Sequence, residues 1–319
     1  MSIILLIIGL ALLIVGANFF VEGASKIASY LHISPLLIGL TIVAFGTSAP
    51  EATVSILAAM GGNADVAIGN VVGSNIFNIT LVVGLTAIIY PLKVENETIR
   101  KEIPFTLLAS VALMIFISDK ALESVSNNVV TRSDGLILLL LFVVFLYYLF
   151  EVARKGRSNT KEEKASQPNA SIWGKQILFT ILGLGAIIFG GDLVVDGATD
   201  IALSFGMSKT LVGLTIVAVG TSLPELVTSI TAAIKKESEI ALGNIVGSNI
   251  FNIMFVLGAA ATISPLGVDP KMFIDISLMI ILTILLLVFS RTNFKIGKFE
   301  GIILAAAYIG YLIYIIARN

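Results

Sequence analysis

The chain reads Gly39-Leu-Thr-Ile-Val-Ala-Phe-Gly-Thr-Ser-Ala-Pro-Glu51 within a long apolar segment. The second half repeats this stretch as Gly213-Leu-Thr-Ile-Val-Ala-Val-Gly-Thr-Ser-Leu-Pro-Glu225, with 11 of 13 positions identical. A second repeated pair follows at the same offset of 174 residues and matches at 10 of 11 positions, over 69–79 and 243–253. A carboxylate inside a membrane span is costly and marks a functional site. Two such carboxylates in duplicated helices interrupted by proline and glycine predict an ion-binding transporter.

The composition is that of an integral membrane protein. The 319 residues are 57% hydrophobic and 13% charged, whereas soluble domains carry about 25% charged residues. The absence of cysteine excludes disulfides and thiolate metal sites, and the single histidine, His32, excludes a multi-histidine metal site. A net charge of −1 argues against nucleic-acid binding.

The apolar segments predict an all-α integral membrane fold with ten transmembrane helices. A span needs about 20 apolar residues, and the candidates are 2–22, 33–60, 65–90, 103–118, 135–154, 173–195, 206–233, 238–264, 271–290 and 299–317. The first is too long for the apolar region of a signal peptide and lacks a basic region before it. Sheets are not expected, because the apolar runs are continuous rather than alternating.

The polar residues divide the chain into two repeats of five helices. The predicted domains are 1–154, a cytoplasmic linker over 155–172, and 173–319. Five is an odd number, so the second repeat is predicted to enter the membrane from the opposite side. With both termini extracellular, 15 of the 20 Lys and Arg residues fall on the cytoplasmic side. This bias agrees with the positive-inside rule and predicts a multi-pass protein of the cell membrane.

The first motif places polar groups on one face of a helix. Thr47, Ser48 and Glu51 share this face with Ala44 and Ser55, because their spacing follows the helical repeat. A proline at position 50 cannot donate to the carbonyl of residue 46, so we expect backbone oxygens at 44–46 to turn towards an ion. The second motif repeats this pattern with Ala218, Thr221, Ser222, Pro224, Glu225 and Ser229.

The next helix of each repeat adds a second polar stripe. Its members are Asn70, Ser74 and Asn78 in the first repeat and Asn244, Ser248 and Asn252 in the second. All these donors are hard oxygens, which suit Ca²⁺ or Na⁺ rather than transition metals. Two glutamates give the site a formal charge of −2, and an empty site of this charge is costly to occlude. Obligatory exchange of ions follows as a hypothesis.

Several polar residues have a second interpretation. A role in helix packing and a role at the site are both open for Ser55, Ser229, Asn70 and Asn244. Asn75 and Asn249 lie off the stripe and are predicted to satisfy local backbone groups. The repeat-related pairs Asn18/Asp192 and Glu22/Asp196 are interpreted as groups at the interface or entrance, near the ends of their helices. Asp275 is expected to be a helix N-terminal acid, favoured by the helix dipole.

The motifs Gly46-Thr-Ser-Ala-Pro-Glu51 and Gly73-Ser-Asn-Ile-Phe-Asn78, with their copies at 220–225 and 247–252, resemble the cation/Ca²⁺ exchanger superfamily. They are most similar to the prokaryotic sodium/calcium exchangers, and the resemblance covers essentially the whole chain. It implies a core built from the second, third, seventh and eighth helices. It also implies that the long first and sixth helices slide across this core to alternate access.

The resemblance also implies roles for individual residues. The central ligands would be Glu51 and Glu225, with Thr47 and Thr221 beside them. The Na⁺ ligands would be Ser48, Ser74, Ser222, Ser248 and the carbonyl groups of Ala44 and Ala218. The remaining positions fall on Asn78 and Asn252. Some relatives carry Asp at the position of Asn252, so the site charge here is −2 rather than −3.

The expected function is therefore a secondary active antiporter that exchanges Na⁺ for Ca²⁺, with three Na⁺ per Ca²⁺ implied by the resemblance. The alternative is a Ca²⁺/H⁺ or other cation/proton antiporter. An intramembrane hydrolase is disfavoured because no nucleophile–base pair is visible, and a channel because two deep carboxylates would hold Ca²⁺ too tightly. We predict no cofactor and no enzymatic activity. The predicted partners are Ca²⁺, Na⁺ and the lipid bilayer, and the chain is expected to act as a monomer.

Overall fold

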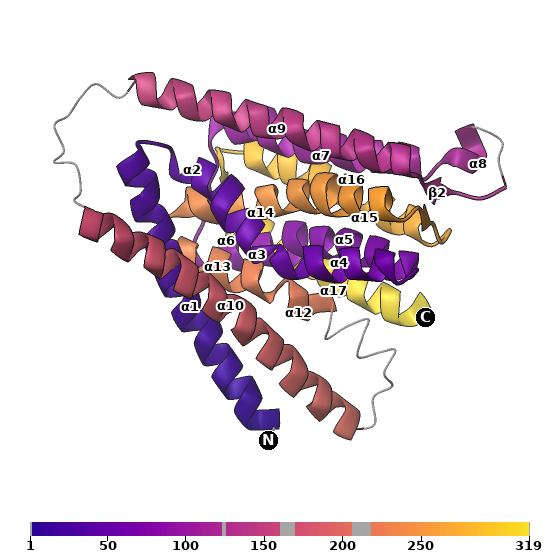
Figure 1. Cartoon of the computed structure of the whole chain (residues 1–319), viewed down its shortest axis with the longest axis horizontal. Helices are drawn as coiled ribbons and strands as arrows, with labels where there is room; N and C mark the ends of the chain where they lie inside the picture. Colours follow the sequence, from indigo (N-terminus) through magenta and orange to yellow (C-terminus); the bar gives the residue numbers. More distant parts are fainter. Residues whose placement is uncertain (1, 123–125, 160–169, 206–217, 319) are drawn as a thin grey trace.

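The computed structural model describes residues 2–122, 126–159, 170–205 and 218–318, and these are mostly helical (Figure 1). Three segments of the first half, η1, η2 and η3, are π-helical. In chain order the elements of this half are α1 (Ser2–Leu31), α2 (Pro35–Ile38), η1 (Gly39–Val43), α3 (Ala44–Thr47), α4 (Ala49–Met60), α5 (Ala64–Phe77), η2 (Asn78–Val82), α6 (Val83–Ile89), β1 (Leu92–Lys93), η3 (Thr98–Glu102), α7 (Ile103–Phe116), α8 (Asp119–Leu122), β2 (Val129–Val130) and α9 (Arg132–Asn159).

The second half repeats this order of elements. It comprises α10 (Ala170–Ser204), α12 (Ala218–Thr221), α13 (Leu223–Ile234), α14 (Ser238–Ile250), the π-helical η5 (Phe251–Leu257), α15 (Gly258–Ile263), β3 (Leu266–Gly267), α16 (Met272–Arg291), β4 (Lys295–Ile296) and α17 (Lys298–Arg318). Helices α9 and α10 both extend into the range predicted as a linker. Of that range, residues 160–169 lie outside the described residues.

The number of membrane-crossing helices is lower than the ten predicted. Within the described residues, seven helices are long and apolar enough to cross a membrane, and the pair Pro35–Thr47 and Ala49–Met60 makes an eighth if it is one span bent by 49°. These eight match eight of the ten predicted ranges. Of the other two, α7 has only 14 residues, and part of 206–233 lies outside the described residues. The count of ten is thus not confirmed, although the protein plainly crosses the membrane several times.

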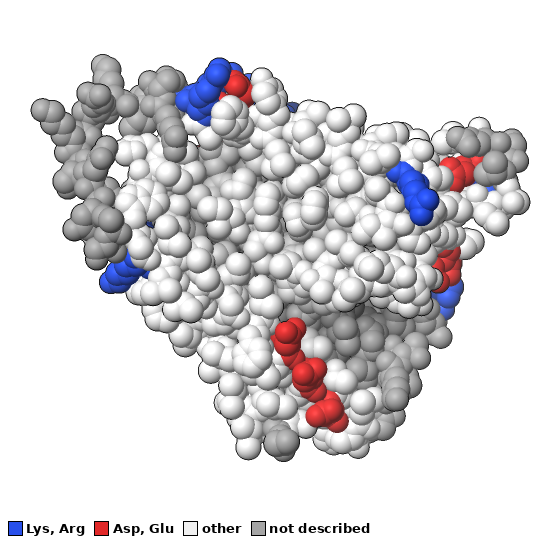
Figure 2. Space-filling model, viewed as in Figure 1, with Lys and Arg blue, Asp and Glu red and all other residues white. Residues whose placement is uncertain are grey.

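The helices fall into a buried core and an outer layer. The most apolar windows of Ala64–Ile89 and Ser238–Ile263 are 72% and 94% buried, whereas those of α1, α9, α10, α16 and α17 are 22–33% buried. The outer helices therefore present their apolar side chains, such as Ile3, Ile14 and Leu140, to the surroundings. Figure 2 shows the result as a broad face with few charged groups. This arrangement is expected where lipid is the solvent.

Helices α1 and α10 lie side by side along most of their length (Figure 1). Glycines spaced by seven residues allow this approach: a Cβ atom on Gly9 would lie 2.7 Å from the Gly190 carbonyl oxygen, and one on Gly16 would lie 2.8 Å from that of Gly183. Small residues let membrane helices pack backbone to backbone. Positions rising along α1 meet positions falling along α10, so the two helices are antiparallel. Gly9 and Gly16 are offset by 174 from Gly183 and Gly190, so these are equivalent helices of the two repeats.

Helix α1 is longer than the predicted span. The span was limited to residues 2–22 by hydropathy, but the helix continues to Leu31. A Cβ on Gly23 would lie 2.9 Å from the Gln176 carbonyl oxygen, so the extension still packs on α10. Two short antiparallel strand pairs, β1 with β4 and β2 with β3, are the exceptions to the prediction of no sheets. Each strand has only two residues, so each pair connects two loops and does not form a sheet layer of the fold.

Candidate ion-binding site

Each repeat breaks a helix immediately before its glutamate. Ser48 joins α3 to α4 with φ −84° and ψ 9°, and Ser222 joins α12 to α13 with φ −94° and ψ 7°. Both breaks are followed by a proline in the first turn of the next helix, where its missing N–H leaves no bond unmade. The glutamates consequently lie in the first turns of α4 and α13. The positive end of a helix dipole favours a carboxylate at this place.

The two glutamates are fully buried and are held by serines of the opposite repeat. Ser222 Oγ donates to Glu51 Oε1 at 2.8 Å, and Ser48 Oγ donates to Glu225 Oε1 at 2.7 Å. The second bond is the first one with both residues shifted by 174 positions. The structure therefore brings these four residues together across the boundary between the repeats.

Several buried oxygens of the predicted site residues have no protein partner. Within the described residues, no hydrogen-bond partner is present for Glu51 Oε2, Glu225 Oε2, Asn78 Oδ1 or Asn252 Oδ1, although all four atoms are buried. Buried polar atoms are normally bonded, so such a group of orphans needs an explanation. Two carboxylate and two amide oxygens are ligands of the hard cations Ca²⁺ and Na⁺.

The remaining site serine pair and the threonines are placed by contacts within and between the repeats. Ser248 Oγ lies 3.4 Å from Glu225 Oε1 and 3.5 Å from the Ala44 carbonyl oxygen. Its counterpart Ser74 is buried on α5. Thr47 Oγ1 donates to Asn244 Oδ1 at 3.0 Å. The repeat-related bond runs from Thr221 to Asn70 Oδ1 at 3.4 Å.

Ser55, Ser229, Asn70 and Asn244, for which packing and site roles were both open, form two equivalent bonded pairs, one in each repeat. Asn70 Nδ2 donates to Ser55 Oγ and Asn244 Nδ2 donates to Ser229 Oγ, both at 2.9 Å. The same amide groups reach the main-chain oxygens of Glu51 and Glu225 at 3.3 and 3.4 Å. Each asparagine thus links two helices of its own repeat and one threonine of the other.

The main-chain bonds at the two helix breaks differ between the repeats. The Ala44 oxygen was predicted to turn away from the helix, but it accepts the Ser48 amide at 3.0 Å and so stays in the helical pattern. This part of the prediction is wrong because Pro50 removes a donor to Gly46 and not to Ala44. In the second repeat the Ser222 amide donates to Val219 O at 3.2 Å. Ala218 begins α12, and its side chain lies outside the described residues.

The prediction for Asn75 and Asn249 is also wrong. Neither satisfies a local backbone group: Asn75 Nδ2 donates to the Asn249 carbonyl oxygen at 3.3 Å, across the two repeats. Asn249 Oδ1 accepts from Asn78 Nδ2 at 3.3 Å, and Asn75 Oδ1 accepts from Asn252 Nδ2 at 3.4 Å. The polar stripe was defined by a spacing of four residues, and this spacing does not include Asn75 or Asn249. Their identity in both repeats was the available signal.

The other polar residues of α1 and α10 lie away from this centre. Asn18 and Glu22 are not near the end of α1, because the helix continues to Leu31. Asn18 Nδ2 donates to Ile14 O, and Glu22 pairs with Lys26. Asp192, Asp196 and Asp200 are exposed on α10 at a spacing of four, and Figure 2 shows acidic groups in a row over this helix. No described contact links them to the glutamates.

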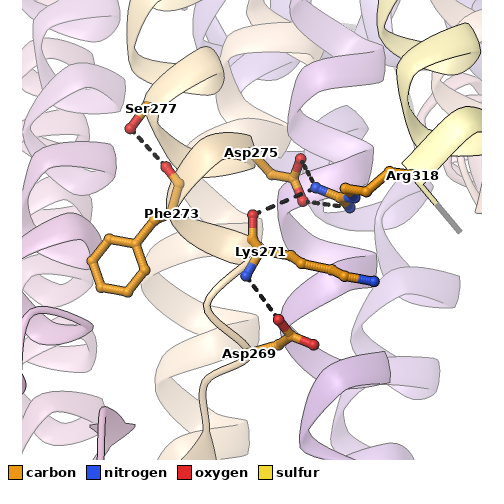
Figure 3. Close-up of polar contacts among 6 residues, drawn as sticks. All are labelled: Asp269, Lys271, Phe273, Asp275, Ser277 and Arg318. Carbon is orange, nitrogen blue, oxygen red and sulfur yellow. Dashed lines mark hydrogen bonds and ion pairs between the residues drawn. The ribbon is translucent and has the colours of Figure 1, made fainter.

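Asp275 has a partner that the sequence did not reveal. It lies in the first turn of α16, as predicted, but it is buried and receives both Nη atoms of Arg318 at 2.9 and 3.0 Å (Figure 3). Arg318 Nη1 also approaches the Lys271 carbonyl oxygen at 3.5 Å. The ion pair ties the end of α17 to the start of α16. It lies at the rim of the bundle, and no described contact links it to the glutamates.

Comparison with known proteins agrees with this geometry. The sodium/calcium exchanger protein family matches residues 1–151 and 175–317. The chain belongs to the sodium/calcium exchanger family. Among its relatives, sodium/calcium exchanger MaX1 of Methanosarcina acetivorans is 32% identical over 97% of both chains, and putative antiporter CaxA of Alkalimonas amylolytica is 43% identical over 97% of this chain and 96% of its own.

Solved structures of the sodium-calcium exchanger NCX_Mj share the fold. One of them superposes with a TM-score of 0.84 at 33% identity, covering 98% of this chain and 97% of that one. The family and the fold are those of ion exchangers, whose substrates are Na⁺ and Ca²⁺. This chain is accordingly a multi-pass membrane transporter of the exchanger family rather than a member of an enzyme family.

Proposed function

We propose that this protein is a secondary active antiporter that exchanges Na⁺ for Ca²⁺ by alternating access. The observation that carries the proposal is the pair of buried glutamates with one free carboxylate oxygen each, Glu51 Oε2 and Glu225 Oε2. Asn78 Oδ1 and Asn252 Oδ1 add two neutral oxygens. Ca²⁺ takes about 6–8 oxygen ligands, and the hydroxyls of Thr47, Thr221 and the site serines extend the set.

The charge of the site supports exchange over uniport. Within the described residues no Lys or Arg pairs with either glutamate, so their charge of −2 when both are ionised has to be balanced by bound cations inside the bundle. One Ca²⁺ or two Na⁺ neutralise it, and a third Na⁺ makes the loaded site positive. We propose three Na⁺ per Ca²⁺, with Na⁺ near Ser48, Ser74, Ser222, Ser248 and the carbonyls of Ala44 and Ala218.

We further propose ten membrane helices in two inverted repeats, 1–154 and 173–319, joined by a cytoplasmic linker, with both termini extracellular. The antiparallel contact of the equivalent helices α1 and α10 supports inversion. The distribution of Lys and Arg supports the orientation. A cysteine introduced at Lys120 should react with an impermeant reagent from outside the cell, and one at Lys295 should not. Reaction at both positions from one side would contradict this topology.

The deciding experiment is uptake of radioactive Ca²⁺ into liposomes that contain the purified protein. An outward Na⁺ gradient should drive uptake, and an outward H⁺ gradient of equal size should not. Empty liposomes and a Na⁺ ionophore, which abolishes the gradient, are the controls. Uptake driven only by H⁺ would overturn Na⁺ coupling and make the protein a cation/proton antiporter.

The stoichiometry has its own test. If three Na⁺ exchange for one Ca²⁺, each cycle moves one net charge, and a charge crossing 100 mV is worth about 2.3 kcal/mol. A K⁺ diffusion potential clamped with valinomycin should then change the rate of Ca²⁺ uptake. Uptake that is independent of this potential would indicate two Na⁺ per Ca²⁺.

A further inference from the structure

Asn75 is a fully buried residue of α5 whose side chain makes two bonds to the other repeat. Its Nδ2 donates to the main-chain carbonyl of Asn249 at 3.3 Å, and its Oδ1 accepts from Asn252 Nδ2 at 3.4 Å. A backbone carbonyl can only accept a hydrogen bond. The first bond therefore fixes which end of the Asn75 amide faces Asn249 and which end faces Asn252.

The orientation of Asn75 determines that of Asn252. Because Asn75 presents an oxygen, Asn252 must turn its NH₂ group towards it and its own Oδ1 away. Asn252 Oδ1 is one of the buried oxygens without a protein partner. An amide oxygen binds a cation, whereas an amide NH₂ group repels one. The bond from Asn252 to Asn75 thus decides whether Asn252 can serve as a ligand.

The equivalent bond in the first repeat is less firmly fixed. Asn78 Nδ2 donates to Asn249 Oδ1 at 3.3 Å, which leaves Asn78 Oδ1 free in the same way. However, Asn249 Nδ2 has no partner within the described residues. Nothing corresponding to the Asn75–carbonyl bond therefore holds Asn249, and the anchored chain of bonds belongs to Asn75 and Asn252 alone.

We propose that Asn75 is a positioning residue of the ion site, which sets the amide of Asn252 with its oxygen available to Ca²⁺. This inference rests on the proposed function, since it concerns the same site. Asn75 itself does not contact the ion. Groups that orient a metal ligand typically contribute about 10–100-fold to metal affinity, which sets the expected effect.

The test compares Asn75→Ala, Asn252→Ala and the double variant by calorimetric Ca²⁺ binding to the purified, Na⁺-free protein. Asn75→Ala should weaken Ca²⁺ binding by about ten-fold or more. In the Asn252→Ala background the same change should weaken it by less than about two-fold, because interacting residues are not additive. In liposomes, the Ca²⁺ concentration for half-maximal exchange should rise while the maximal rate is kept.

Two further variants separate positioning from stability. Ser110→Ala removes a buried side-chain bond on α7 away from the site, and it should leave Ca²⁺ binding unchanged. Asn75→Asp keeps an acceptor for Asn252, replaces the donor to Asn249 with a second oxygen and adds a negative charge, so it should bind Ca²⁺ at least as tightly as the wild type. It also keeps the test usable if Asn75→Ala does not fold.

Three results would overturn the inference: wild-type affinity in Asn75→Ala, equal losses in both backgrounds, or a ten-fold loss in Asn75→Asp. Failure of the proposed function would be seen separately. A wild-type protein without Na⁺-driven Ca²⁺ exchange would refute that function before any variant is compared. A wild-type protein that exchanges normally, with an unaffected Asn75→Ala, would refute only the role of Asn75.

Discussion

The two halves of the site have nearly the same sequence and share several equivalent hydrogen bonds, but these bonds differ in length and burial. The Thr47–Asn244 bond is 3.0 Å long and both residues are buried, whereas the Thr221–Asn70 bond is 3.4 Å long and both residues are only half-buried. The two repeats therefore share this threonine–asparagine bond, but the bonded residues differ in their exposure to solvent. One closed and one more open half is the asymmetry that the proposed alternating access requires.

The largest expected effect tests the equivalence of the halves. Glu51→Gln and Glu225→Gln each remove one charge and should lower Na⁺-driven Ca²⁺ uptake by at least about 100-fold, or about 3 kcal/mol. The control is Glu151→Gln, which removes the same charge from a surface ion pair and should leave uptake unchanged. If one glutamate variant kept substantial uptake, that glutamate would not be an essential ion ligand and the two halves would not be equivalent.

The next effect concerns a feature that only the second half has. The position equivalent to Asp275 in the first half is Lys101, which pairs with Glu97. Arg318→Ala leaves the buried Asp275 carboxylate unpaired and should lower the free energy of unfolding by about 3 kcal/mol.

Thermal unfolding in detergent measures this loss, with Arg154→Ala as the surface control. Ca²⁺ affinity should not change, because the pair lies at the rim. An unfolding midpoint equal to that of the wild type would mean that the ion pair does not clamp α17 to α16.

A smaller effect tests the symmetric contact of α1 with α10. Gly16→Ala and its repeat equivalent Gly190→Ala should each destabilise the protein by about 1–3 kcal/mol, because the new methyl group would lie within 3 Å of the facing helix. Gly185→Ala, on the same helix with nothing within 4 Å, is the matched control and should be neutral or stabilising. Unequal losses at positions 16 and 190 would show that the contact is not symmetric.

The smallest effect measures the asymmetry directly. Thr47→Val removes the shorter, buried bond and Thr221→Val the longer, half-buried one, so the first should cost about 1 kcal/mol of stability and the second less. Thermal unfolding of both variants without Na⁺ or Ca²⁺ tests the order. Equal losses would imply that the closed and the open half interconvert freely in the ion-free protein.

Much of this arrangement could be predicted because the two repeats have nearly the same sequence in their polar motifs. The repeated Pro-Glu pairs located the helix breaks, and the polar stripes identified Asn78 and Asn252 as buried polar residues with a free amide oxygen each. Hydropathy located eight of the spans, but it ended α1 at residue 22 because it measures contact with lipid and not helix length. The actual end depends on packing against α10.

The errors share one physical cause. Ala44 and Asn75 were interpreted from neighbours along one helix, whereas Asn75 contacts Asn249 and Asn252 far away in the chain. Asp275 does lie in the first turn of its helix as predicted, but the same local reasoning missed its distant partner Arg318. For Ala44, the proline was assigned the wrong carbonyl by the same local reasoning. Helical spacing identifies a shared face, but it does not identify what the opposite helix offers.

The reciprocal bonds from Ser48 to Glu225 and from Ser222 to Glu51 have the form of an isologous interface, in which residue i of one copy binds j of the other and j binds i. A homodimer with such an interface must keep both copies identical, so every substitution appears twice. A single chain is released from this constraint. Here one copy has Asn18 where the other has Asp192, and one has Lys101 where the other has Asp275. Fusion thus allows the two sides of one transport site to be altered independently.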